Sequence, residues 1–177
     1  MIEIASPLVG KVDLAGEQVK LSELRTGLLH IRGKAAEQVL NAAAMAVGDV
    51  LKTDEGLLVR LRRDEFVLLT EEVNAATERI AQQIGDQHVT LTDITHGRGG
   101  MTLSGKRVND VLAKVCALDF GKFVNYHAAQ SSLAKVRALI IRHDGGDLPT
   151  HHIIVDRSMA AYVWDVVWDA AQEFAHA

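Results

Sequence analysis

The sequence contains a single cysteine, Cys116, among 177 residues, so no disulfide can form within the chain. A lone cysteine favours a reducing compartment, and we therefore expect a cytoplasmic protein. No apolar run approaches the roughly 20 residues that a membrane-spanning helix needs. The first ten residues, MIEIASPLVG, lack the basic segment and apolar stretch of a secretory signal peptide.

An excess of positive charge is also missing. The chain has 19 Lys and Arg residues against 23 Asp and Glu residues, a net charge of −4. It therefore carries no overall positive field to attract nucleic acid or an anionic membrane. The 48% hydrophobic and 24% charged residues are typical of a globular protein and argue against a disordered chain. Its length suits one large domain or two small ones.

An internal repeat organises the sequence. The residues Ile31–Leu40 and Leu103–Leu112 share one layout, an apolar strand end, a Gly-Lys pair and then a helical apolar stripe. The two glycines, Gly33 and Gly105, lie 105 − 33 = 72 residues apart. A repeat of this length indicates two related structural units, neither of which buries its sheet easily alone.

The apolar spacing predicts the elements of each half. Alternation predicts strands, spacing of three and four predicts helices, and Gly or Asp clusters mark turns. In the first half we expect a strand at 27–32, a helix at 36–47, a hairpin at 56–69 and a helix at 73–84. In the second half we expect strands at 89–94 and 101–104, a helix at 108–115, strands at 133–141 and 153–155, and a helix at 159–175.

This order predicts an α+β fold, in which two related strand-helix-strand-strand-helix halves form a mostly antiparallel sheet with packed helices. The hairpin that follows each first helix argues against a long parallel sheet. We expect an N-terminal tail at 1–25, lying on the domain or on a partner. A single domain would follow at 26–177, made of pseudo-repeats at 26–86 and 87–177.

Two glycine-rich stretches invite a phosphate-binding interpretation. Gly100–Lys106 approaches the phosphate-cradling loop, but Arg107 replaces the required hydroxyl and Met101–Ser104 has the pattern of a strand. His96–Gly100 could wrap an anion with its backbone amides, yet apolar strand residues flank it on both sides. We therefore expect a structural bend and a structural turn.

Histidine and cysteine are residue types that serve in metal sites and in catalysis. His151 and His152 follow His143 and Asp144, but adjacent residues of a strand point to opposite faces. We expect a solvated loop and an edge strand there, with no metal site. Cys116 is expected to be a buried thiol rather than a nucleophile, because free cysteines are among the most buried residues.

The last helix contains both tryptophans, Trp164 and Trp168, at a spacing of four. They form a stripe beside the apolar stripe of Met159, Val163 and Val166. Two interpretations stay open: the indoles cover one end of the core, or they enter a partner protein.

Blocks of sequence in the second half carry a family resemblance. They are Thr92–Arg98, Leu103–Gly105, Val111–Lys114, Cys116–Asp119 and the ending Ile154–Trp164. Together they resemble the gamma subunit of heterotetrameric sarcosine oxidase, from about residue 28 onward. The resemblance implies a fold similar to the folate-binding domain of aminomethyltransferases, which is also built from two related halves.

The resemblance also implies a function. The assembled enzymes oxidatively demethylate sarcosine, pass the methyl carbon to tetrahydrofolate and make peroxide, with FAD, FMN and NAD held by the large subunits. The gamma subunit is an accessory chain with no known catalytic residue. For this chain the resemblance therefore implies no cofactor of its own, large flavin-binding alpha and beta subunits as partners, and a small delta subunit.

Two hypotheses follow for this chain. In the first it is a non-catalytic subunit, whose Trp164, Trp168 and N-terminal tail contact the partner subunits. In the second it is a stand-alone tetrahydrofolate-binding or one-carbon transfer module, which needs an acidic residue to hold the pterin. Asp93 is the candidate for that role. Neither hypothesis assigns the chain a catalytic residue or a metal site.

Overall fold

The computed structural model describes residues 5–175, which form two compact units. Unit 1 contains residues 5–25 and 96–175, and unit 2 contains Thr26–Thr95. Within the described residues, every pair of neighbouring strands is antiparallel. No helix in this part of the chain is both long and apolar enough to cross a membrane.

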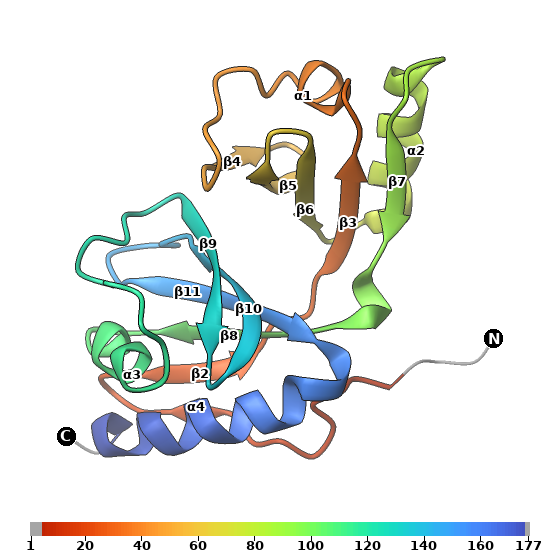
Figure 1. Cartoon of the computed structure of the whole chain (residues 1–177). Helices are drawn as coiled ribbons and strands as arrows, with labels where there is room; N and C mark the ends of the chain where they lie inside the picture. Colours follow the sequence, from red (N-terminus) through yellow and green to blue (C-terminus); the bar gives the residue numbers. More distant parts are fainter. Residues whose placement is uncertain (1–4, 176–177) are drawn as a thin grey trace. The chain divides into compact units, whose positions relative to one another are not determined.

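Unit 2 is a five-stranded sheet of order β4-β5-β6-β3-β7 with helices on one face (Figure 1). Its elements are β3 (Gly27–Arg32), α1 (Ala36–Val39), β4 (Val50–Thr53), β5 (Gly56–Arg62), β6 (Glu65–Thr70), α2 (Val73–Ile84) and β7 (Thr90–Asp93). The alternation of β3 directs Leu29 and Ile31 into a core that also takes Ala76 and Ile80 from α2. The short helix η1 (Thr95–Gly97) then leads the chain out of β7.

Unit 1 is a six-stranded sheet of order β1-β2-β8-β11-β10-β9. Its elements are β1 (Leu14–Ala15), β2 (Lys20–Glu23), β8 (Arg98–Ser104), α3 (Val108–Val115), β9 (His127–Leu133), β10 (Val136–Arg142), β11 (Thr150–Asp156), η2 (Arg157–Met159) and α4 (Ala160–Ala175). The apolar stripes of α3 and α4 pack on the same core as the inner faces of β8 and β11 (Figure 1). The predicted α+β class is therefore confirmed.

The repeat appears as one backbone turn that is used twice. Gly33 follows β3 and Gly105 follows β8, and both have positive φ angles, 155° and 131°. A Cβ atom at Gly33 would lie 2.1 Å from the carbonyl oxygen of His88, and one at Gly105 would lie 2.2 Å from that of Gln18. Only glycine fits so close to a neighbouring backbone at such an angle, which explains why the Gly-Lys pair recurs.

The two sheets have the same strand order once β1 is set aside. The order β4-β5-β6-β3-β7 of unit 2 corresponds to β9-β10-β11-β8-β2 of unit 1. The strands β2 and β7 are exchanged between the two sheets. β2 precedes β3 in the chain but pairs with β8, whereas β7 precedes β8 but pairs with β3. The described part of the predicted tail, residues 5–25, thus contributes β1 and β2 to the sheet of unit 1.

The helix predicted at 36–47 is wrong beyond its first turn. α1 ends at Val39, and Asn41 has a positive φ of 51°, which a helix cannot contain. The guanidinium of Arg60 donates hydrogen bonds to the carbonyl oxygens of Ala42 at 3.4 Å and Met45 at 2.6 Å. Both carbonyl oxygens accept hydrogen bonds from a side chain of β5 instead of from N–H groups of a helix. The segment therefore lies as a loop over that strand.

Candidate functional site

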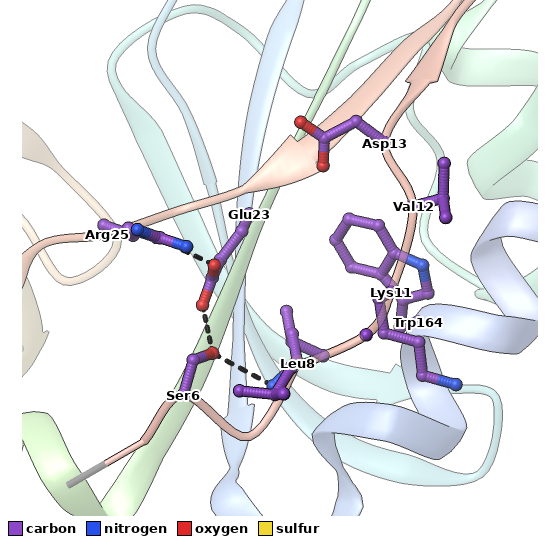
Figure 2. Close-up of a pocket in the computed structure, with 10 residues that line it drawn as sticks. Ser6, Leu8, Lys11, Val12, Asp13, Glu23, Arg25 and Trp164 are labelled. Atoms are coloured by element: carbon purple, nitrogen blue, oxygen red, sulfur yellow. Dashed lines mark hydrogen bonds and ion pairs between the residues drawn. The ribbon is translucent and has the colours of Figure 1, made fainter.

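A pocket of about 710 Å³ opens on unit 1 (Figure 2). One wall is the N-terminal segment, defined here as Ser6–Asp13. Glu23 of β2, Arg25 and Trp164 of α4 complete the lining. A volume of this size lies within the roughly 300–1,000 Å³ range of ligand-binding pockets in proteins.

The N-terminal segment is anchored by Leu8, whose side chain is buried in the core of unit 1. The hydroxyl oxygen of Ser6 accepts a hydrogen bond from the backbone N–H of Leu8 at 3.0 Å and donates one to the carboxylate of Glu23. The ammonium of Lys11 donates to both carboxylate oxygens of Asp165 on α4, at 2.6 and 2.7 Å. Contacts at both ends therefore hold this wall of the pocket in place.

The charges around the pocket are not all compensated. Lys11 is paired with Asp165, and the guanidinium of Arg25 lies 2.8 Å from the carboxylate of Glu23. Asp13 is exposed, and its carboxylate makes no hydrogen bond or ion pair with any other residue from 5 to 175. The uncompensated charge of the lining is therefore negative.

Two apolar side chains of the same segment face solvent. Val9 is 72% exposed and Val12 is 73% exposed, although the backbone that carries them is anchored at both ends. The pocket thus offers a carboxylate, an indole and aliphatic groups. These groups suit binding of a cation with an apolar neighbour, and no histidine among the lining residues could serve as a general base.

The two tryptophans have different environments. Trp164 is 2% exposed and packs in the core of unit 1, with part of its ring reaching the pocket (Figure 2). Trp168 is partly buried and packs against the same core. The interpretation in which the indoles cover the core therefore describes Trp164 well. The contact of either tryptophan with a partner stays a prediction.

Asp93 ends β7 as an exposed residue. Its carboxylate accepts a hydrogen bond from the backbone N–H of Thr95 at 2.9 Å, while the hydroxyl of Thr95 accepts one from the N–H of Leu28 at 2.9 Å. Asp93 therefore shapes the turn between β7 and η1, as aspartates often do at turns. Its role in holding a pterin stays a prediction.

The glycine-rich stretch contains a strand and the cysteine is buried, as predicted. Arg98–Ser104 is strand β8, so no phosphate loop precedes Gly105. A Cβ atom at Gly99 would lie 2.4 Å from the Cβ of Ala160, so this glycine lets the start of α4 approach the strand. Cys116 is a buried free thiol, 3.7 Å from the hydroxyl of Ser131.

The solvated edge strand predicted for His151 and His152 is wrong. β11 lies between β8 and β10, so it is an inner strand and its residues are covered on both edges. His152 contacts the hydroxyl of Thr102 at 3.0 Å on one face, and His151 is fully buried on the other. Residues 5–175 contain no group of three or more His, Cys, Asp or Glu side chains placed to hold a metal ion.

His151 is a buried imidazole without hydrogen bonds. Neither of its ring nitrogens has a partner among the described residues, and the ring packs against Phe120 and Phe123 at centroid distances of 5.7 and 5.9 Å. Burial, reinforced by the positive charge of Arg142, lowers the pKa of His151 to about 4. This histidine is therefore neutral at pH 7.

The buried His151 predicts a loss of stability in mild acid. In the unfolded chain its pKa returns to about 6.5, so its contribution to the free energy of unfolding is complete above pH 6.5 and falls towards pH 4. Between pH 7 and pH 5 we expect a loss of about 2 kcal/mol from this residue, at about 1.4 kcal/mol per pH unit below 6.5. Urea unfolding at both pH values measures it.

The matched variants separate His151 from other groups that titrate. His151→Leu should lose the share of the acid sensitivity that comes from His151 and keep the share of His152, because burial lowers the pKa of His152 to about 4 as well. His96→Gln, at an exposed site, should keep both shares. An equal pH dependence in His151→Leu and the unaltered chain would show that other groups cause the effect.

Comparison with known proteins assigns the fold to a family. The profile of the GCVT N-terminal domain matches residues 17–177, which is most of the chain. The chain belongs to the GCVT N-terminal domain family. No curated protein sequence in the comparison matches it.

Two solved structures are similar to this chain. A chain of the heterotetrameric sarcosine oxidase from Corynebacterium sp. U-96, in complex with pyrrole 2-carboxylate, has 26% identity and a TM-score of 0.84. The match covers 98% of this chain and 97% of that chain. The glycine cleavage system aminomethyltransferase T from Bartonella henselae has 15% identity and a TM-score of 0.73, over 92% of this chain and 48% of its own.

These comparisons confirm the resemblance that the sequence blocks indicated. The GCVT-family chain has the fold of the aminomethyltransferase folate-binding domain, with its two related halves. Sequence reasoning did not find the pocket or Asp13. The signal available was weak: a short segment of mixed polar and apolar residues, with two valines, in a stretch that has no strand or helix period.

Proposed function

We propose that the chain is an accessory, non-catalytic subunit of a heterotetrameric complex of the sarcosine oxidase type. The observation that carries this proposal is the match to one chain of such an enzyme, which extends over 97% of that chain at a TM-score of 0.84. The aminomethyltransferase is matched over only 48% of its length. A subunit of the oxidase therefore accounts for the extent of the similarity better than a whole aminomethyltransferase does.

The surface of unit 1 supports a role in assembly. Val9 and Val12 are exposed to solvent on an anchored segment, and Met159 of η2 and Tyr162 of α4 are also exposed. Ordered apolar side chains gain stability when a partner removes them from water, by about 25 cal/mol per Å² of buried area. In this proposal the N-terminal segment and α4 contact the larger subunits.

The complex would oxidatively demethylate sarcosine and couple the released carbon to tetrahydrofolate. In it, large alpha and beta subunits would hold FAD, FMN and NAD, the delta subunit would complete the tetramer, and tetrahydrofolate would bind outside this chain. This chain would position and stabilise the large subunits without binding a cofactor. A cytoplasmic location agrees with the single, reduced Cys116.

Co-expression tests the proposal. The tagged chain should co-purify with large flavin-binding subunits as one species on size-exclusion chromatography, and the complex should oxidise sarcosine. Omitting the chain should lower the yield or stability of the flavin-containing complex more than the turnover per flavin. A chain that elutes alone, beside fully assembled and active large subunits, would contradict the assignment.

The family match favours one second candidate, a stand-alone tetrahydrofolate-binding module. Titration of the isolated chain with 5-formyltetrahydrofolate tests it. Saturable micromolar binding that weakens in Asp93→Asn supports this candidate. Asp86→Asn is the matched control, because Asp86 is also exposed and lies in the same unit. Absence of binding leaves the subunit role as the proposed function.

A further inference from the structure

We propose that the pocket beside Trp164 receives a Lys or Arg side chain of a partner polypeptide, with Asp13 as its counter-charge. This inference rests on the proposed role as a subunit and specifies the chemistry of one contact. It concerns unit 1 alone, because every lining residue belongs to that unit.

The expected charge of the occupant follows from which charged side chains of the pocket lining are already paired. Lys11 is held by two short contacts to Asp165, and Arg25 is held by Glu23, so neither cation is available without breaking a pair. The carboxylate of Asp13 has no partner in the described chain and points towards the hollow (Figure 2). A cation in the pocket completes the pairing, whereas an anion would meet an uncompensated carboxylate.

The shape of the lining favours a long cationic side chain. Leu8 and Trp164 supply apolar surface inside the pocket, and Val12 stands next to Asp13 at its rim. Lys and Arg pack their methylene groups on such apolar surface while the charged end reaches a polar group. In the ion pair of Glu23 and Arg25, the Arg25 side chain is exposed, so this pair would contribute little to binding of the occupant.

The exposed valines favour a polypeptide over a small free amine. A free amine would satisfy Asp13 but would leave Val9 and Val12 in solvent at 72% and 73% exposure. A polypeptide with apolar residues on either side of its cation covers these side chains and the carboxylate together. An apolar centre with a polar rim is the usual composition of a protein interface.

The indole N–H signal of Trp164 gives a direct readout of the pocket by NMR, and a Trp168→Phe variant assigns it. The probe is the blocked tripeptide acetyl-Val-Arg-Val-amide, with acetyl-Val-Gln-Val-amide and agmatine as comparisons. We expect a saturable shift with the arginine peptide, at least about fivefold weaker binding of the glutamine peptide and of agmatine, and weaker binding at high salt.

Asp13→Asn should weaken binding of the arginine peptide about fivefold or more, whereas the control Asp86→Asn in unit 2 should not change it. Equal affinity for the arginine and glutamine peptides, no shift at millimolar peptide, or unchanged binding in Asp13→Asn would overturn the inference. Agmatine binding as tightly as the peptide would overturn the choice of a polypeptide.

The outcome is separable from that of the proposed function. If the chain assembles with the large subunits but the arginine peptide does not bind, only the pocket inference fails. If the peptide binds as expected and no assembly forms, the subunit role fails while the pocket chemistry stands.

Discussion

Replacing Gly105 by alanine should destabilise unit 1 by about 3–5 kcal/mol. The new Cβ would lie 2.2 Å from the carbonyl oxygen of Gln18 and 2.9 Å from the Cα of Val19, and the φ of 131° disfavours any side chain. The backbone at Gln18 leads into β2, so relief of the clash must disturb the pairing of β2 with β8. Urea unfolding monitored by tryptophan fluorescence measures the loss, since both tryptophans lie on α4.

Gly146→Ala is the matched control in the same unit. A Cβ at Gly146 meets no atom within 4 Å, and its φ lies outside the left-handed region. We expect its effect to stay within about 0.5 kcal/mol. Gly33→Ala should behave like Gly105→Ala in unit 2, because its Cβ would lie 2.1 Å from the carbonyl oxygen of His88. Equal stability of Gly105→Ala and Gly146→Ala would refute the structural role of the repeated turn.

These glycines also show what sequence could predict. The turns after β3 and β8 depend on a local feature, a glycine between an alternating strand and a helical apolar stripe. Both turns can therefore be predicted from the sequence. The residues that pack against each glycine come from far along the chain and lead into a strand: Gln18 and Val19, before β2, lie at Gly105, and His88 and Val89, before β7, lie at Gly33. The exchange of β2 and β7 between the sheets produces no local sequence pattern, because strand pairing is set by contacts across the sheet.

The segment after α1 shows why a correct pattern can still mislead. Its apolar residues follow helical spacing as far as Val47, yet Val47 is exposed, whereas Ala42 and Met45 are buried. The segment buries apolar side chains as a loop, and many short apolar sequences fit more than one periodicity. The side chain of Arg60 on β5 donates hydrogen bonds to two carbonyl groups of this segment, and the sequence pattern places Arg60 only in a hairpin.

The candidate pocket could be predicted only in part from the sequence. The sequence marks Trp164 as an unusual residue and predicts that the N-terminal residues form a tail on the domain or on a partner. The pocket depends on bringing Asp13, Glu23 and Trp164 together, and these come from three separate stretches of the chain. Which of its charges is uncompensated depends on the pairing of Lys11 with Asp165, a contact between residues at opposite ends of the sequence.

Replacing Arg60 by leucine should destabilise unit 2 by about 3–5 kcal/mol. Arg60 is 6% exposed, and its guanidinium donates to the carbonyl oxygens of Met45 at 2.6 Å and Arg63 at 2.7 Å and pairs with Glu37. Leucine fills part of the space over Phe66 but leaves the buried carbonyl of Met45 without a donor, at about 1–3 kcal/mol, and removes the partner of Glu37. Urea unfolding gives the total loss.

Amide hydrogen exchange localises the effect of Arg60→Leu. Exchange should rise first across residues 41–49, because the guanidinium is the side chain that holds this loop to β5. Arg62→Leu is the matched control two residues along the same strand. Its side chain is exposed and its pair with Glu65 is 3.5 Å long, so the expected change is below about 1 kcal/mol. If the two variants proved equally stable, the loop after α1 would owe its conformation to its own sequence rather than to Arg60.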